Sequence, residues 1–558
     1  MDNIRLILFF SLAFILLMLW QAWNEDYGPK PIPAETVSTT ANGETPSPSA
    51  VPQAPAESAV PSAEVPSGAV PTAPEMTSAG SAGQKIAVMT DLYNMEIDTR
   101  GGNVLKVFLN DYPETLKNPE QKFQLLRSQT PNLLIAQSGL ISNDKENAPT
   151  HEAVYSVEQT SYTMAEGSNT LEVNLFWTND KGVKVTKRFS FQRGSYQVKV
   201  QHIVENGSGE TWNGREYRQL VRSEPVDTSA DSKLLYTYTG AAIYSPEEKF
   251  EKITFEDMED SKLDRDVKGG WISMLQHYFM AAWVPKPEET DKFYTNVLSN
   301  GRYIVGAYSP PMSVAAGSQD TFTTSFVAAP KLQDKLAEIA PGLDLTVDYG
   351  WLTVLAQPIF WLMNKIHSVV GNWGWSIIIL TLLIKLAFYK LSETSYKSMA
   401  NMRKMTPRIQ ALKDRYGDDK QRLNQAMMEM YKTEKVNPLS GCLPILVQIP
   451  VFIALYWVLL ESVEMRQAPF MLWIQDLSVK DPYFVLPVIM GVSMFIQQKL
   501  NPAPPDPMQA KIMMSLPFVF TVFFAFFPAG LVLYWVVNNI LSITQQWYIT
   551  RQIEQASK

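Results

Sequence analysis

One apolar stretch constrains this chain more than any other feature, because it is long enough to cross most of a bilayer and yet contains a cation. The stretch extends from Trp373 to Tyr389, and roughly 20 helical residues span the hydrocarbon. Lys385 lies roughly 18 Å along such a helix from Trp373, given the rise per residue. An ammonium there costs on the order of 3 kcal/mol. We expect it to face a wet cavity, with ion pairing or snorkelling as the alternatives.

The length, net charge and cysteine count of the chain limit what it can be. A length of 558 residues gives room for two or three domains. The net charge of −8 provides no overall basic face, so we expect no specific nucleic acid as a partner. The single cysteine, Cys442, excludes an intrachain disulfide, so any exported domain depends on its hydrophobic core.

The first 84 residues indicate a membrane anchor and a tether. Residues 1–23 contain Arg5 and then an apolar run that ends at Trp20, as in a cleaved signal peptide or a retained signal anchor. No small-x-small cleavage site follows the run, and tryptophan suits a membrane interface. We therefore predict a signal-anchor transmembrane helix with a cytoplasmic N-terminus. Residues 24–84, rich in Pro, Ala, Ser and Thr, predict a disordered linker.

Residues 85–340 predict an antiparallel β-sandwich. Apolar and polar residues alternate over Leu171–Trp177, Val183–Phe189 and Tyr196–Ile203, and turn residues separate such runs about every 10 residues. The region has no HExxH, Walker, GxSxG or paired-cysteine motif. We assign it no catalytic residue, metal or cofactor, and we expect His202 to be a hydrogen-bonded strand histidine.

Residues 351–370 predict an amphipathic helix. Its apolar residues recur at spacings of three and four: Leu352, Leu355, Ile359, Leu362, Ile366 and Val369. Tryptophan residues lie at its start, at 351, within it, at 361, and just after it, at 373 and 375. Such a distribution is typical of a membrane surface. We expect this helix to lie in the outer interface; packing on the sandwich is the alternative.

Residues 391–436 predict a cytoplasmic helical hairpin. Ten basic residues, Arg408 among them, outnumber six acidic ones, which is typical of a cytoplasmic loop. Met402 and Met405 belong to one apolar stripe, and Met427 and Met430 belong to another. Such stripes usually pack a hairpin on itself, whereas methionine also suits an adaptable contact with a nascent chain. The charges form a solvated face or meet anionic lipid or ribosomal RNA.

Four further apolar segments complete a core of five helices within residues 371–550, with a cytoplasmic C-terminus. They are 443–460, 483–497, 512–527 and 531–547. The last contains polar residues over its inner half, at about the depth of Lys385: Asn538, Asn539, Ser542, Thr544, Gln545 and Gln546. Lone amides commonly join membrane helices. Several at one depth beside a cation favour a hydrated groove that opens to the cytoplasm and closes outward.

The chain resembles the YidC-type membrane-protein insertases of Gram-negative bacteria over nearly its full length. The motifs that carry the resemblance are Asn372–Ile379, Gly417–Gln421, Glu434–Leu439, Phe527–Tyr534 and Gly269–Gln276. The resemblance implies a multi-domain membrane protein with a periplasmic β-supersandwich and five core helices around a hydrophilic groove. It implies a non-enzymatic insertase and folding chaperone of the inner membrane that acts alone or with the Sec translocon.

The resemblance also implies roles for particular residues. The family's groove cation, usually arginine, falls on Lys385, which keeps the charge but loses the bidentate geometry. Other groove positions fall on Gln448 and Ser542, beside Asn538 and Gln545 from the polar cluster. The positions that guide substrate along the helices, called the slide here, are Thr381, Ile449, Phe452 and Tyr534. Expected partners are nascent membrane proteins, the phospholipid bilayer, the Sec translocon, and the ribosome or signal-recognition machinery at the hairpin.

Two other functions compete with this hypothesis. A small-solute secondary transporter is the first, but the core shows no inverted repeat and no paired broken helices. An envelope sugar-binding sandwich protein with a passive anchor is the second, but five polar-studded spans exceed what anchoring needs.

Overall fold

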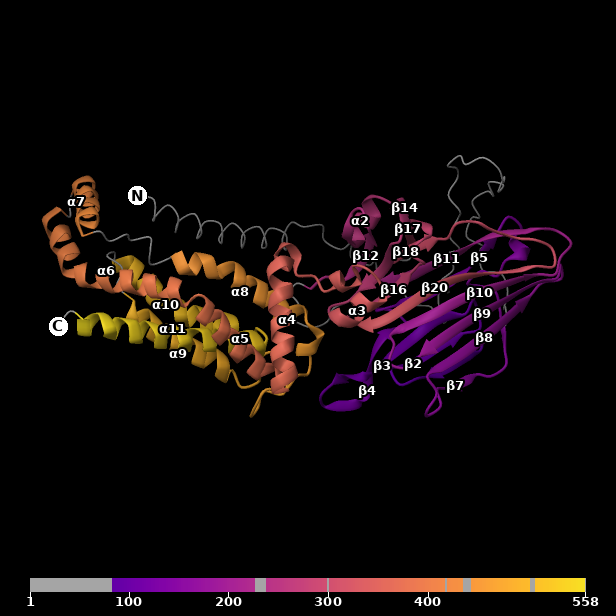
Figure 1. The fold of residues 1–558 in the computed structure, drawn as a ribbon, viewed down its shortest axis with the longest axis horizontal. Coiled ribbons are helices and arrows are strands. Elements are labelled where there is room, and N and C mark those ends of the chain that lie inside the picture. The colour runs from indigo at the N-terminus through magenta and orange to yellow at the C-terminus, as the bar shows by residue number, and fades with distance from the viewer. Residues whose placement is uncertain are drawn as a thin grey trace, which may run out of the picture. The chain divides into compact units, whose positions relative to one another are not determined.

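The computed structural model describes residues 83–225, 237–298, 301–416, 419–434, 443–501 and 507–556. The predicted signal anchor and nearly all of the predicted linker lie outside these residues. Figure 1 shows a strand-rich region followed in the chain by a helical region.

Two mainly antiparallel sheets build the strand-rich region, which confirms the predicted sandwich. In spatial order the first sheet contains β14 (Asp264–Lys268), β17 (Thr290–Leu298), β18 (Arg302–Tyr308), β11 (Trp212–Ser223), β5 (Leu134–Ser142), β3 (Asn103–Thr115), β2 (Tyr93–Asp98), β1 (Lys85–Met89) and β7 (Ser161–Thr163), with β19 (Met312–Val314) on β11 and β4 (Asn118–Leu126) on β3. The second contains β13 (Lys249–Ile253), β12 (Gly240–Ser245), β15 (Trp271–Leu275), β16 (Phe279–Val284), β20 (Gln319–Pro330), β10 (Gln197–Asn206), β9 (Val183–Gln192), β8 (Thr170–Thr178) and β6 (Ser156–Val157).

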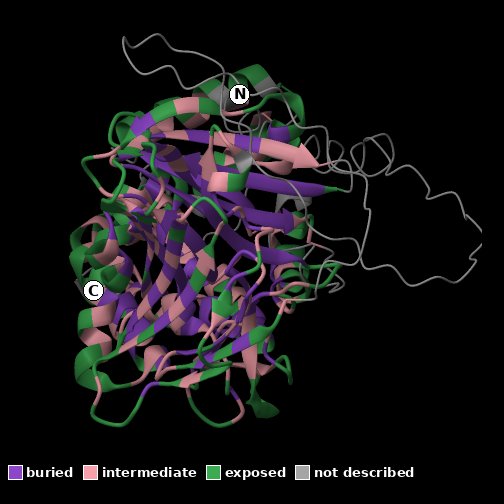
Figure 2. Ribbon diagram, turned by 90° about the vertical axis from the view of Figure 1, so that its right-hand side faces the viewer, coloured by how far each residue is buried: buried purple, intermediate pink, exposed green. Residues whose placement is uncertain are grey.

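Period-two sequence patterns set which side chains face the core. In β9 the side chains of Val183, Val185, Phe189 and Phe191 are buried, while those at the alternate positions 184, 186, 188 and 190 are exposed or half-buried. Figure 2 shows the buried residues running through the strands. Lys187 occupies an inward position of β9 and is also fully buried, so a charge enters the interior of the sandwich.

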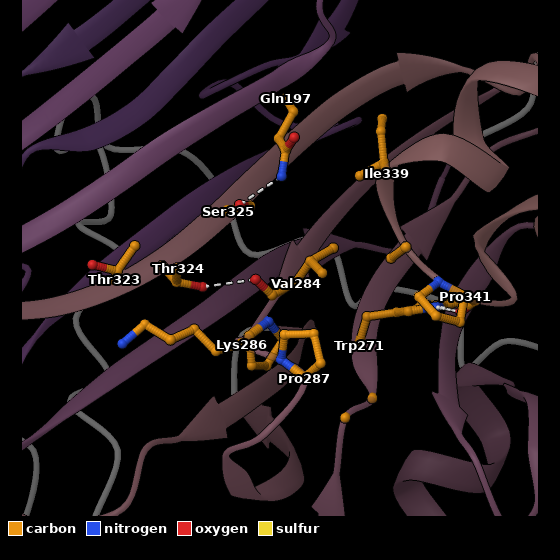
Figure 3. Close-up of a pocket in the computed structure, with 14 residues that line it drawn as sticks. Gln197, Trp271, Val284, Lys286, Pro287, Thr323, Thr324, Ser325, Ile339 and Pro341 are labelled. Atoms are coloured by element: carbon orange, nitrogen blue, oxygen red, sulfur yellow. Dashed lines mark hydrogen bonds between the residues drawn. The ribbon is translucent and has the colours of Figure 1, made fainter.

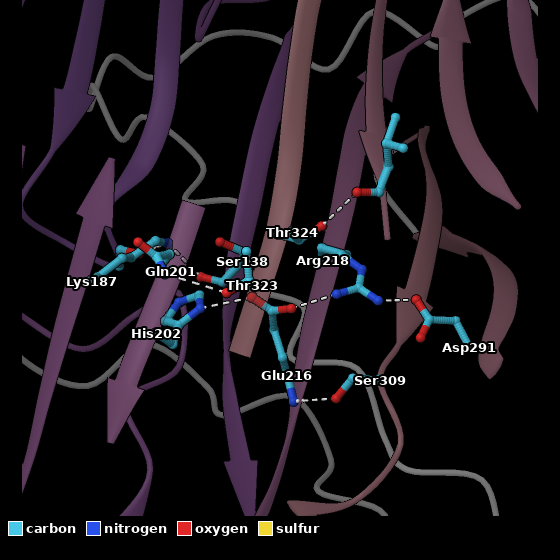
Figure 4. Close-up of polar contacts among 12 residues, drawn as sticks. Ser138, Lys187, Gln201, His202, Glu216, Arg218, Asp291, Ser309, Thr323 and Thr324 are labelled. Atoms are coloured by element: carbon cyan, nitrogen blue, oxygen red, sulfur yellow. Dashed lines mark hydrogen bonds and ion pairs between the residues drawn. The ribbon is translucent and has the colours of Figure 1, made fainter. Parts of the chain in front are cut away.

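A layer of buried polar residues crosses the sandwich at the level of Lys187 (Figure 4). The Nδ1 atom of His202 lies 2.8 Å from Oε1 of Glu216. Arg218 pairs with both Glu216 and Asp291. All of these side chains are at most 1 % exposed. The expected hydrogen bond of His202 is therefore present, and it belongs to an ionic network between the sheets.

Lys187 lies on the same sheet as His202 and completes this layer. Its ammonium donates hydrogen bonds to the carbonyl oxygens of Gly101, at 2.8 Å, and Ser138, at 2.9 Å. The layer separates two hydrophobic clusters, because along β9 it lies between Val185 of the smaller cluster and Phe189 of the larger one. A buried polar layer of this kind favours one alignment of the two sheets, since a shift would strand its charges in apolar surroundings.

Ten helices are described outside the short 3₁₀ turns. They are α2 (Phe255–Asp260), α3 (Gln333–Ile339), α4 (Thr353–Val370), α5 (Trp373–Ala387), α6 (Tyr389–Tyr416), α7 (Lys420–Thr433), α8 (Leu443–Glu461), α9 (Val485–Leu500), α10 (Pro507–Phe524) and α11 (Ala529–Ala556). Local sequence sets the boundary between α4 and α5. Gly371, at φ 68°, ends α4 in the left-handed region, and the side chain of Asn372 accepts from the Trp375 amide to cap α5.

Helix lengths differ from the apolar segments that predicted them. No single helix in the described ranges is both long and apolar enough to cross a membrane. The pair α5 and α6, bent by 67°, meets that standard together, and 447–461, 485–500 and 510–524 are shorter apolar helices. The last helix extends to Ala556, beyond the predicted end at Trp547, because the polar residues that follow are good helix formers that hydropathy does not detect.

The buried ionic layer should dominate the stability of the sandwich. Asp291→Ala leaves the Arg218 guanidinium short of a partner in a dry site, so it should lower the free energy of unfolding by about 3–5 kcal/mol. Thermal unfolding of the full chain measures the loss. Lys181→Ala, which removes an exposed pair with Asp144, is the control and should change the melting temperature little. Equal effects of the two substitutions would contradict this role.

The stability of the sandwich should also depend on pH through Lys187. Burial lowers the pKa of this ammonium from 10.5 to about 7, against an opposing effect of Glu216. Between those pH values the unfolded chain holds a proton that the folded chain has released, so the free energy of unfolding should rise with pH. Lys187→Met should flatten that rise in denaturant titrations at several pH values. A slope that Lys187→Met leaves unchanged would assign the dependence to other groups.

Candidate substrate groove

Lys385 lies in the last turn of α5, where its side chain is almost wholly buried at 9 % exposure. Its ammonium donates a hydrogen bond to the hydroxyl of Ser542 on α11, at 2.8 Å. That hydroxyl in turn donates to the backbone carbonyl of Asn538, at 2.7 Å. The structure thus joins two of the residues predicted for the groove, and they come from helices far apart in the sequence.

Further polar contacts connect α11 with its neighbours near this pair. Asn539 donates through Nδ2 to the hydroxyl of Ser493 on α9, at 3.1 Å. Gln546 donates to Oδ1 of Asn501, also at 3.1 Å. Gln545 donates to the carbonyl oxygen of Tyr389, at 3.4 Å, where α5 meets α6. The polar half of α11 is therefore bonded to its neighbours on several sides.

Two of the predicted groove residues are placed less directly. Gln448 on α8 is half-buried, and the structure has no hydrogen bond between it and Lys385. Asn538 is half-buried and supports Ser542 through its backbone. The described geometry therefore centres the site on Lys385 and Ser542.

The four slide positions have different environments. Phe452 stacks on Tyr534, with ring centroids 5.6 Å apart. Ile449, one turn earlier on α8, is 42 % exposed. Thr381 is buried and donates to the carbonyl oxygen of Ile377, at 2.6 Å. An apolar surface for a substrate helix is thus available at Ile449 and near Phe452, whereas Thr381 lies inside the helix packing.

The hairpin residues lie on α6 and α7. Met405 is buried at 6 % exposure, and Met402, Met427 and Met430 are half-buried. Arg408 forms an ion pair with Glu434. The methionines therefore contribute to the packing of the hairpin, and the basic residue lies on its exposed side.

Several buried polar residues of the helical region are absent from the predicted set of groove residues. Ser392 and Ser395, three residues apart on α6, are 4 % and 3 % exposed. Ser493, Asn539 and Gln546 are similarly buried. Small hydroxyl residues are common in both apolar and polar segments, so their pattern carries little signal. Asn539 and Gln546 were visible as part of the polar cluster of the last span.

The sandwich contains a separate depression (Figure 3). Polar side chains on its floor bond to one another or to the backbone: Gln197 to Ser325 at 2.8 Å, and Thr324 to the Val284 carbonyl at 3.2 Å. No histidine, cysteine or carboxylate lines it. The depression therefore offers no acid–base pair, and the helical region remains the better candidate for function.

Comparisons with known proteins match the whole chain. A family model described as the YidC periplasmic domain matches residues 85–362, and one described as 60Kd inner membrane protein matches residues 365–556. The membrane protein insertase YidC of Thioalkalivibrio sulfidiphilus is 53 % identical over 567 aligned positions, covering 100 % of both chains. That of Methylococcus capsulatus is 51 % identical, covering 100 % of this chain and 99 % of the relative.

A solved structure described as an active YidC insertase with its first transmembrane domain resolved aligns with 84 % of this chain and 93 % of its own. Its sequence identity to this chain is 18 % and the TM-score is 0.38. The family assignment therefore depends on the sequence matches, which cover both the sandwich and the helical region at about half identity. The chain belongs to the YidC family of membrane protein insertases of the bacterial inner membrane.

Proposed function

We propose that this insertase moves the hydrophilic end of a nascent membrane protein through a hydrated groove centred on Lys385 and Ser542. The groove opens to the cytoplasm and closes outward. A short acidic segment enters it, attracted by the ammonium of Lys385. The apolar segment that follows then leaves sideways into the lipid, so the reaction needs no covalent step and no nucleotide.

The observation that carries this proposal is an unbalanced charge. Lys385 is nearly buried, and among the described residues no carboxylate lies within ion-pair distance of its ammonium. By contrast, the buried Arg218 of the sandwich has two carboxylate partners. A buried charge that lacks a counter-charge is costly unless water or a ligand compensates it. Water at rest and an anionic peptide during insertion supply that compensation.

The lateral route follows apolar helix faces. On α8, Phe452 stacks on the ring of Tyr534 and makes an edge-to-face contact with the ring of Trp535. Phe518 and Val522 on α10 are 68 % and 65 % exposed, as suits contact with acyl chains. The membrane potential favours outward movement of an acidic tail by about 2.3 kcal/mol per charge per 100 mV. The membrane potential thus favours outward movement of the acidic tail, and the apolar helix faces favour sideways movement of the apolar segment into the lipid.

The topology that fits this route places the sandwich in the periplasm and the α6–α7 hairpin and both termini in the cytoplasm. Helix α4 then lies in the outer interface, where Trp351 and Trp361, at 82 % and 61 % exposure, meet the headgroup region. The basic hairpin is the contact surface for the ribosome or signal-recognition machinery. Cooperation with the Sec translocon is part of the same proposal.

Charge at position 385 should decide the insertion of acidic substrates. Lys385→Ala should reduce the yield of a single-span substrate with an acidic tail by about tenfold in proteoliposomes, since a lost charge interaction is worth on the order of 1.4 kcal/mol. Lys385→Arg should retain most of the yield. The same substrate with a neutralised tail should be insensitive to both substitutions. Unchanged insertion of the acidic substrate by Lys385→Ala would refute attraction by charge.

If the groove is hydrated, water should be able to replace the Ser542 hydroxyl as the hydrogen-bond partner of Lys385. If water reaches Lys385, then Ser542→Ala exchanges one hydrogen bond for another and should lower stability by less than about 1 kcal/mol, with insertion largely kept. Unfolding in detergent and the insertion assay give the two values. Ser493→Ala, which removes the partner of Asn539, is a matched control for a lost interhelical hydrogen bond of about 0.6 kcal/mol. A loss of several kcal/mol for Ser542→Ala alone would indicate a dry site.

A further inference from the structure

The loop between α8 and α9, residues 462–484 and called the outer loop here, is packed into the helical core. Its side chains at Met465, Ala468, Ile474 and Leu477 are at most 7 % exposed. They belong to one hydrophobic cluster with residues of α5 and α11. A connection that only joined two spans would expose such side chains at the surface. The packing indicates that the outer loop has a function of its own.

The outer loop is bonded to the first turn of α5. Asn372 donates through Nδ2 to the carbonyl oxygens of Pro469 and Phe470, each at 3.1 Å. The Phe470 ring lies so close to Gly374 that a Cβ atom there would come within 2.0 Å of it. Only glycine permits this approach. The start of the helix that carries Lys385 is therefore held against the loop by hydrogen bonds and by shape.

The same loop is bonded to the first turn of α11. The amides of Ala529 and Gly530 donate to the carbonyl oxygens of Val479, at 2.7 Å, and Leu477, at 2.9 Å. The loop thus joins the outer ends of the two helices that carry Lys385 and Ser542. It connects them at the end opposite to those two side chains.

Asp481 fastens the loop to α9 and to itself. Its carboxylate is 1 % exposed and accepts from Nε1 of Trp473, at 2.9 Å, through Oδ1 and from the Leu486 amide, at 2.7 Å, through Oδ2. Helix α9 begins after Phe484, which has φ 55° and provides no side-chain cap. A buried carboxylate at a helix start stabilises the free amides and holds a strained residue in place. Asp481 therefore caps α9 and closes the loop in one contact.

We propose that the outer loop clamps the outer ends of α5, α9 and α11 together, and that Asp481 is the positioning residue that keeps this clamp shut while the groove admits substrate from the cytoplasm. The helices then separate at their inner ends only, and the groove does not become a continuous pore. This inference rests on the proposed groove, and it adds the element that closes the groove outward.

Side-specific thiol labelling tests the clamp in the full chain. A reporter cysteine replaces Ser542 in a Cys442→Ser background, and a membrane-impermeant maleimide is applied to spheroplasts or to inverted membrane vesicles. With Asp481 intact, the reporter should react in inverted vesicles and be protected in spheroplasts. In Asp481→Asn, the new side-chain NH₂ group faces either the amide of Leu486 or the indole N–H of Trp473, so two donors oppose each other and one hydrogen bond is lost. The substitution should speed labelling in spheroplasts by about tenfold or more, as loss of a hydrogen bond to a charged group shifts an equilibrium by at least that factor.

Asp476→Asn is the matched control, because the Asp476 carboxylate accepts hydrogen bonds from the amide and hydroxyl of Ser478 within the loop. The reporter in this variant should stay protected. Trp473→Phe keeps an aromatic ring but removes the donor to Asp481, and it provides the test if Asp481→Asn does not accumulate. Continued protection in spheroplasts with normal labelling in inverted vesicles would overturn the clamp and leave the groove standing. Protection of the parent reporter in inverted vesicles would overturn the groove and the clamp together.

Discussion

The cost of keeping an ammonium away from bulk water organises the helical region. Lys385 has a hydroxyl as its partner rather than a carboxylate, and a hydroxyl compensates only part of a full charge. Other polar side chains of α11 are hydrogen-bonded to their neighbours, Asn539 to Ser493 of α9 and Gln546 to Asn501. Under the proposed mechanism, water and an acidic peptide supply the compensation that the hydroxyl of Ser542 cannot.

The two regions treat buried charge in opposite ways. In the sandwich, Arg218 is paired with two carboxylates and the network connects two sheets, so its charges serve to fix one arrangement. Within the described part of the helical region, the charge of Lys385 has no carboxylate partner. The arrangement of the helices is fixed instead at their opposite ends, where the outer loop packs against α5 and α11. Rigidity at one end and polarity at the other would let substrate enter without opening a pore.

Much of this architecture was predictable from local pattern. Period-two alternation identified strands such as β8, β9 and β10, and the apolar segments identified the core helices, because both patterns reflect burial of one face or one span. Lys385 and Ser542 were identified because a cation and polar groups in apolar segments are conspicuous. Their direct contact was not derivable, since it depends on how α5 and α11 pack across a long sequence separation.

Other features lay beyond the sequence for identifiable reasons. The sandwich network joins residues from several strands that are distant in the sequence. The alternating pattern of β9 places position 187 inward whether it holds a lysine or a valine, so the pattern does not reveal a buried charge. Ser392, Ser395 and Ser493 are small and common, so their burial in the helical region left no trace in composition. The outer loop resembles an ordinary connection, and the contacts of Asp481 appear only when Trp473 and Leu486 are brought to it by the fold.

The central claim is that water reaches the groove, and deuterium-modulated electron spin echo measurements test it most directly. Spin labels at Asn538, one turn before Ser542 on the same face, and at Ile540, which is 48 % exposed on another face of α11, lie at nearly the same depth. In bilayers prepared with D₂O, a hydrated groove gives strong deuterium modulation at position 538 and weak modulation at position 540. Equal modulation at the two positions, or a dry position 538, would contradict it.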